Sequence, residues 1–178
     1  MNLSDAAAVA GIFSSAAVAV SLVYLALQVR QAERNQRGLM QQGRADRVSE
    51  YSMRLAADPT LVALVTKGHW TPEQLTLEEF EQYMNYCRAS FLSGEDSFLQ
   101  HRTGLLDDAA FHSFAEGGRT ALLRPGYRAA WRMSSRAYGP EYADFMDGMV
   151  KAASSSTATR TGRFEEWRRA VSEIGASA

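Results

Sequence analysis

The sequence predicts an all-α protein, in which a single N-terminal transmembrane helix continues into an antiparallel bundle of about five or six helices. Three observations lead to this fold class. An uncharged run of 22 residues lies close to the N-terminus. Helix-start signals recur afterwards, each followed by apolar residues at helical spacing. The 178 residues include only four Pro and few runs of Val, Ile and Thr, so strands are not favoured.

The uncharged run, residues 6–27, is long enough to cross a membrane. A helix of this length spans about 33 Å, and a hydrocarbon core is about 30 Å thick. A secretory signal peptide is one alternative, but Asp5 precedes the run and no basic residue does. A buried helix of a soluble core is the other alternative, because eight of the 22 residues are Ala. We interpret the run as a transmembrane helix.

The flanking charges predict the orientation of this helix. No Lys or Arg precedes the run, and five Arg follow it within about 20 residues. Basic residues are retained on the cytoplasmic side of a membrane. We therefore expect residues 1–5 outside, or in the periplasm of a bacterium, and everything after the span in the cytoplasm. The five are Arg30, Arg34, Arg37, Arg44 and Arg47.

The remainder divides into four parts. Residues 28–47 are polar on all sides and predict a solvated helical stalk, which also has the charge to contact anionic lipid. Residues 48–153 predict the helical bundle, of ordinary domain size. Residues 154–162 have the composition of a flexible linker. Residues 163–178 predict a last amphipathic helix and tail, with one apolar face formed by Phe164, Trp167, Val171 and Ile174.

Within the bundle, local signals predict where the helices begin and end. Asp58-Pro59 starts a short helix that Gly68 is expected to end. Thr76 and Glu79 form a capping box that opens the longest helix, 77–102. Asp107 caps a helix over 108–123. The other expectations are a single turn at 72, a turn at Arg124-Pro125-Gly126, an apolar face from Tyr127 to Gly139-Pro140, and a helix with Tyr142, Phe145, Met146, Met149 and Val150 inward.

Most of the chain, from Asp5 to Val150, resembles a group of uncharacterised bacterial proteins. The resemblance rests on AVSLVYLALQVRQAERNQR after a short acidic N-terminus, and on the pattern Glu95, Gly104-Leu105-Leu106-Asp107, Phe111, Pro125-Gly126 and Trp131. These proteins share one N-terminal span, a basic and polar stalk and a compact helical domain. The resemblance implies this architecture and a bacterial inner membrane, and it implies no activity.

The sequence holds no recognisable catalytic or cofactor motif. His69, His101 and His112 form neither H-E-x-x-H nor Glu-x-x-His, so we expect surface or capping roles and no metal. Cys87 lies on an apolar stripe, where a thiol packs as a small hydrophobe. Phosphate-loop and nucleophile-elbow patterns are missing, and we expect no cofactor. A net charge of −1 gives no general attraction to nucleic acid.

Glu95 is the one unusual polar residue. Its helical neighbours at i±3 and i±4 are Phe91, Leu92, Phe98 and Leu99. A carboxylate centred on an apolar face is expected to be buried, and a buried charge needs a partner. Arg88 and Arg102 lie two turns away on the same face, and another helix could bring Arg128 or Arg132 to it. We therefore expect a buried ion pair at Glu95, with a ligand or proton site as the alternative.

Small residues recur along the span and predict helix association. Gly11, Ser15 and Ala19 repeat every four residues, a spacing that lets helix backbones approach closely in lipid. Ala-rich composition alone is the alternative explanation. The sequence therefore predicts a non-enzymatic, membrane-anchored accessory or scaffold subunit, with membrane lipid and a membrane-protein partner or a second copy as its contacts. A membrane-tethered sensor domain, binding a small ligand between helices near Glu95, is the second hypothesis.

Overall fold

The structure is a computed structural model that describes residues 3–153 and 159–176, with side-chain surroundings given from residue 15 onward. In this part of the chain every regular element is helical, so the predicted all-α class is confirmed. Helix α1 (Leu3–Ala57) contains the apolar run and the polar stalk in one uninterrupted helix. The chain forms two compact units, residues 1–49 and 50–178, and the division falls next to the expected start of the bundle at Val48.

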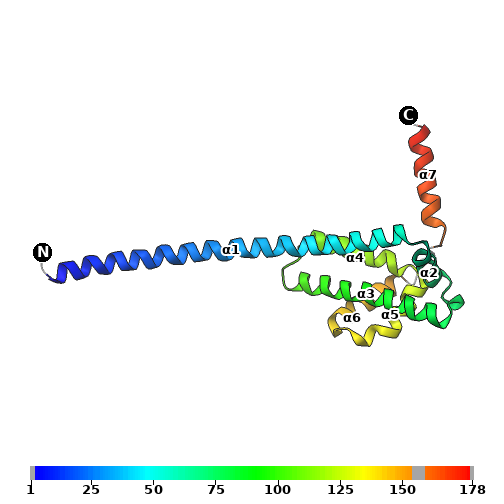
Figure 1. Cartoon of the computed structure of the whole chain (residues 1–178), viewed down its shortest axis with the longest axis horizontal. Helices are drawn as coiled ribbons and strands as arrows, with labels where there is room; N and C mark the ends of the chain where they lie inside the picture. Colours follow the sequence, from blue (N-terminus) through cyan, green and yellow to red (C-terminus); the bar gives the residue numbers. More distant parts are fainter. Residues whose placement is uncertain (1–2, 154–158, 177–178) are drawn as a thin grey trace. The chain divides into compact units, whose positions relative to one another are not determined.

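Five helices of the second unit pack around one core (Figure 1). Helix α3 packs against α2, α4 and α5, and α4 also packs against α5 and α6. Two short 3₁₀ segments, η1 (Pro72–Gln74) and η2 (Ser135–Ala137), lie between helices. The five helices are α2 (Pro59–Trp70), α3 (Leu77–Arg102), α4 (Asp108–Leu122), α5 (Pro125–Ser134) and α6 (Pro140–Ala153).

The predicted helix starts are confirmed at three caps. The Asp58 carboxylate accepts hydrogen bonds from the amides of Thr60 and Leu61 at the start of α2. Thr76 and Glu79 form the reciprocal capping box of α3. The Asp107 carboxylate accepts from the Ala110 amide and caps α4. Each side chain satisfies backbone donors that have no partner inside the helix.

Large side chains fill the core, and Trp131 lies at its centre. Trp131 is fully buried, and its indole Nε1–H donates to the Asp147 carboxylate over 2.7 Å. The ring of Phe91 meets it edge to face, with centroids 5.1 Å apart. Cys87 is also fully buried, as the apolar stripe predicted. The core comprises Tyr83, Cys87, Phe91, Leu122, Tyr127, Ala130, Trp131, Tyr142, Met146, Met149, Val150 and Ala153.

Helix α2 packs so closely against α5 and α3 that two glycines are required. A Cβ on Gly126 would overlap the carbonyl oxygen of Gly68, and a Cβ on Gly68 would overlap the ring of Tyr83. Two sequence expectations are corrected here. Gly68 does not end its helix, because α2 continues to Trp70. Gly126 is not in a turn: Pro125 occupies the first position of α5, and Gly126 is the buried second residue.

The last described helix, α7 (Gly162–Ala176), begins close to its expected start. Residues 154–158 of the expected linker and the final residues 177–178 lie outside the described part of the chain, as do residues 1–2 of the expected extracytoplasmic segment.

The glycine contact predicts that replacing Gly126 with Ala destabilises the domain severely. Because the obstructing atom belongs to the backbone of α2, it cannot move as a flexible side chain would, and we expect a loss of about 3 kcal/mol or more in the free energy of unfolding. Chemical denaturation of the full chain in detergent, followed by circular dichroism, measures it.

Gly148→Ala in α6 is the matched control. Its Cβ meets nothing within 4 Å, so the better helix propensity of Ala should stabilise by up to about 1 kcal/mol. Equal effects of the two substitutions would contradict the close contact between α2 and α5.

Candidate functional site

Glu95 links α3 to the start of α6. The side chain is half-buried, and its Oε1 accepts a hydrogen bond of 2.7 Å from the Gly139 backbone amide. The Gly139 carbonyl accepts the first bond of α6, from the Ala143 amide, so Gly139 is the N-cap residue. The carboxylate therefore lies at the positive end of the α6 dipole and satisfies one of its free donors.

This geometry corrects the expected buried ion pair at Glu95. Arg88 is exposed on α3, and Arg102 pairs with Glu141 at the surface. A backbone amide at a helix start therefore occupies the place that we assigned to a guanidinium. Such an amide serves the same electrostatic purpose, and the sequence gives no sign of it, because it depends on which helix end is brought to Glu95 by the fold.

Removing the Glu95 carboxylate should destabilise the fold by the loss of a helix cap, which is a smaller effect than the loss of one partner of a buried ion pair. We expect Glu95→Ala to lower the free energy of unfolding by about 1–2 kcal/mol, and Glu95→Gln, which keeps an acceptor oxygen, to lower it less. Denaturant melts of the three chains give the order. A loss of about 4 kcal/mol or more would contradict this account, because it would indicate a stranded buried charge.

A second cluster of polar and aromatic groups surrounds His69. We expected a surface or capping role for this residue, but its side chain is only 6% exposed. Three tyrosine rings meet the imidazole at centroid distances of 5.7 to 5.9 Å, those of Tyr83, Tyr86 and Tyr127. The imidazole Nε2 has no hydrogen-bond partner among the described residues. The cluster thus brings together side chains of α2, α3 and α5.

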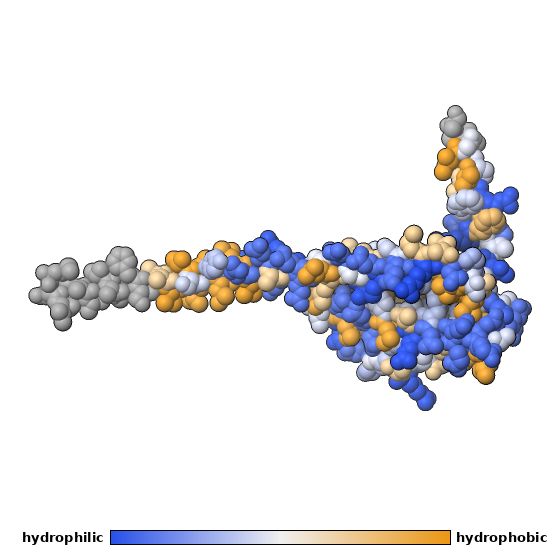
Figure 2. Space-filling view, viewed as in Figure 1, coloured by the Kyte–Doolittle hydropathy of each residue, from blue (hydrophilic) through white to orange (hydrophobic). Residues whose placement is uncertain are grey.

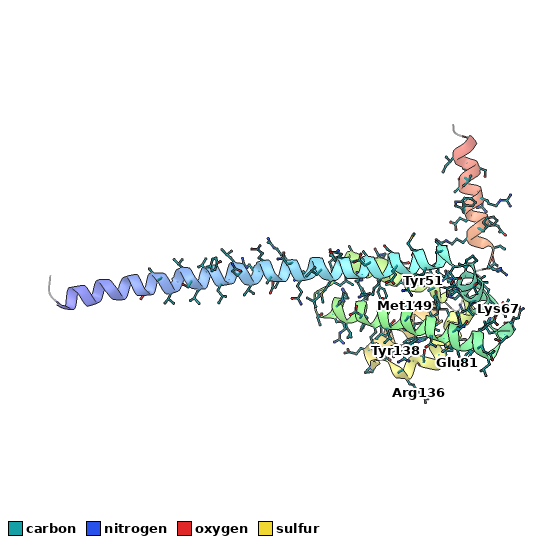
Figure 3. All side chains as sticks on the ribbon, in the orientation of Figure 1. Tyr51, Lys67, Glu81, Arg136, Tyr138 and Met149 are labelled. Atoms are coloured by element: carbon teal, nitrogen blue, oxygen red, sulfur yellow. The ribbon has the colours of Figure 1, made fainter. Side chains whose placement is uncertain are left out.

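The same cluster joins the C-terminal end of α1 to the domain. The Tyr51 and Tyr86 hydroxyls form a hydrogen bond, and the two ring centroids lie 5.7 Å apart. The Tyr127 hydroxyl bonds Ser90 Oγ over 2.6 Å. Tyr51, which is labelled in Figure 3, thus connects the last turns of α1 to Tyr86 on α3.

Burial makes the groups of this cluster poor acids and bases at neutral pH. Burial, and to a smaller extent the positive charge of Arg124, lowers the pKa of His69 to about 3. Burial raises the pKa of the Cys87 thiol to about 12. Burial also raises the pKa of Tyr127. At neutral pH the His69 imidazole is therefore neutral, and the Cys87 thiol and the tyrosine phenols keep their protons. Groups in these states are suited to packing rather than to nucleophilic or acid–base catalysis.

The pKa of His69 predicts a pH-dependent stability. In the folded chain the imidazole stays neutral down to about pH 3, whereas in the unfolded chain it takes up a proton near pH 6.5. Its contribution is therefore complete above about pH 6.5 and declines as the pH falls towards 3. We expect a slope of about 1.4 kcal/mol per pH unit over this window.

Denaturant melts of the wild-type chain and of His69→Phe between pH 8 and pH 5 isolate this effect as a difference. His112→Gln is the control, because His112 is exposed on α4. A parallel loss of stability in the wild-type chain and in His69→Phe would contradict a buried, neutral imidazole at position 69.

The small-residue face of α1 is described only in part. The side-chain surroundings of Gly11 lie outside the described residues, whereas Ser15 and Ala19 are exposed. The apolar residues that follow are exposed as well, and Figure 2 shows them as a hydrophobic stretch of α1. One described helix, Ser15–Ala57, is long and apolar enough to cross a membrane, and none of its most apolar window is buried. The exposed residues are Val18, Val20, Leu22, Val23, Tyr24, Leu25 and Leu27.

Two surface hollows lie on the second unit. One, of about 420 Å³, is lined by Arg132, Ser135, Asp147, Val150 and Lys151. The other, of about 460 Å³, lies along the end of α1 and α2 and includes Leu55, Pro59 and Val62. Glu95 lines neither hollow. Within the described ranges, no three His, Cys, Asp or Glu side chains gather in a way that would hold a metal ion.

Sequence reasoning missed the His69 cluster, although a signal was present. His69 follows Val65 by four residues and Gly68 by one, so it continues the apolar face of α2. Because we expected the helix to end at Gly68, His69 was not included in this helical pattern. The tyrosines come from α3 and α5, so their convergence depends on the α2–α5 glycine contact, which a single sequence does not reveal.

Comparisons of the chain with protein-family models, with curated proteins and with solved structures gave no match. The function must therefore be inferred from the residues and their geometry.

Proposed function

We propose that this protein is a membrane-anchored, non-enzymatic accessory or scaffold subunit on the cytoplasmic face of a bacterial inner membrane. One observation carries the proposal: the apolar part of α1 is exposed along its whole described length. A helix that belonged to the core of this chain would be covered by it. Exposed apolar surface on this scale is costly in water, so lipid or other transmembrane helices are its natural surroundings.

The second unit supports an interaction role more than a catalytic one. The Glu95 carboxylate caps α6, the Asp147 carboxylate holds the Trp131 indole, and the Cys87 thiol is buried in the core. Each of these groups thus has a structural use. The sensor hypothesis loses its original motivation for the same reason, because Glu95 is already satisfied by a backbone amide.

The distribution of charge supports a cytoplasmic position for the second unit. Five Arg follow the span and no Lys or Arg precedes it, which is the asymmetry of a helix whose C-terminal side stays inside. The buried Cys87 makes this orientation easy to test, because its thiol is both inaccessible and un-ionised at neutral pH.

An impermeant thiol reagent on intact cells should report the orientation directly. In a Cys87→Ser background, a single cysteine replaces Asn2 or Ala178 at either end of the chain. We expect labelling of the Asn2→Cys chain only, and labelling of both after the cells are opened. Labelling of the Ala178→Cys chain alone in intact cells would reverse the proposed topology.

Association through the span should depend on the face formed by Gly11, Ser15 and Ala19. Between apolar helices in lipid, packing geometry decides association, so a bulky side chain on this face blocks close approach. We expect Gly11→Leu with Ser15→Leu to reach the membrane but to lose most of its cross-linked oligomer, or of the membrane partner recovered with it after mild detergent extraction.

Ala17→Leu with Ser21→Leu is the matched control, because it enlarges one apolar and one Ser position on another side of α1 by the same kind of change. Equal yields for both double variants and the wild-type chain would show that the small residues do not mediate assembly.

A further inference from the structure

Helix α7 carries an apolar face that no part of the described chain covers. Its four large apolar side chains lie on one side of the helix, and each is about half exposed or more. The rings of Phe164 and Trp167 stack against each other, with centroids 6.0 Å apart. The exposed fractions are 57% for Phe164, 60% for Trp167, 49% for Val171 and 72% for Ile174.

The charges of α7 are ordered around this face. At about 100° per residue, Arg163 and Arg168 lie about 60° and 80° from its centre, one on each border. The three acidic residues lie about 120° or more from the centre, on the far side, together with Arg169. The Arg168 guanidinium also lies 5.8 Å from the centre of the Phe164 ring. The acidic residues are Glu165, Glu166 and Glu173.

We propose that α7 binds a phospholipid surface, lying in its plane with the apolar face among the acyl chains. The charge order complements such a surface. Arginines at the border extend their guanidinium groups to the lipid phosphates while their stems remain in the apolar zone, and the carboxylates face water. Phe and Trp beside these arginines suit the headgroup boundary, where aromatic rings concentrate.

A protein occupant fits the helix less well. A stable protein interface uses about 20–30 residues on each side, whereas α7 offers one face of four large side chains. With the exception of Arg169, the charges of α7 sort by sign with distance from the apolar face, and this order matches a lipid surface that presents phosphate at one depth. A second copy or another protein would have no reason to require this order.

The inference rests on the proposed membrane anchor, which brings α7 near a bilayer. Residues 28–57 amount to about 45 Å of helix, and the eight residues between Ala153 and Gly162 reach about 26 Å when extended. If α1 and α7 contact the same bilayer, the domain has two points of attachment to it. The second contact would then fix the domain against the lipid surface instead of holding it away.

The test uses the full chain in proteoliposomes of zwitterionic and anionic phospholipids that carry brominated acyl chains. Trp70→Phe removes one fluorophore, and Trp131 is fully buried, so Trp167 reports on α7. We expect Trp167 to lose most of its emission to the bromines. Val171→Asp should abolish this loss, and Ser172→Asp, the adjacent residue outside the apolar face, should leave it in place.

The outcomes separate this inference from the proposed function. In one outcome the chain still floats with the vesicles, but Trp167 is unquenched or is quenched equally in the two Asp variants. In that case α7 does not bind lipid, whereas the α1 anchor is supported. If the chain floats only when residue 171 is Val, the α1 anchor fails and α7 alone holds the chain to lipid. Trp167 shielded by a concentration-dependent oligomer would assign the face to a second copy and overturn the inference.

Discussion

The apolar stretch of α1 is the constraint on which the rest of the account depends. Its side chains, from Val18 to Leu27, are exposed, and the helix continues without a break into a polar stalk. Such a helix has two halves that prefer different surroundings. Lipid around the apolar half and water around the polar half satisfy both preferences. The two halves belong to one continuous helix, and none of its described residues has a positive φ.

The helical domain is built so that its polar groups stabilise the fold. Glu95 caps α6, Asp147 holds the indole of Trp131, and Tyr127 bonds Ser90. The glycine contact between α2 and α5 brings His69 among three tyrosines, and Tyr51 attaches the end of α1 to the same cluster. Polar groups used in this way hold the helices of the second unit together, which is compatible with the proposed accessory or scaffold role.

Much of the fold was predictable because it depends on local chemistry. The starts of α2, α3 and α4 follow from Asp58, Thr76 with Glu79, and Asp107, whose side chains act within one turn of helix. The errors occurred where distant segments meet. Gly68 and Gly126 have the composition of a helix end and a turn, but they are needed for close packing. Glu95 was identified as unusual, yet its partner is a backbone amide from a helix 44 residues away, which carries no side-chain signal.

The measurement that tests the central claim most directly is alkaline carbonate extraction of membranes from cells that express the full chain. If α1 crosses the bilayer, the chain stays with the membrane pellet. Leu22→Arg with Leu25→Arg should release it, because two charges in the span make insertion costly, while Gln28→Arg with Gln31→Arg in the stalk should not. Release of the wild-type chain by carbonate, or equal retention of both double variants, would contradict the account.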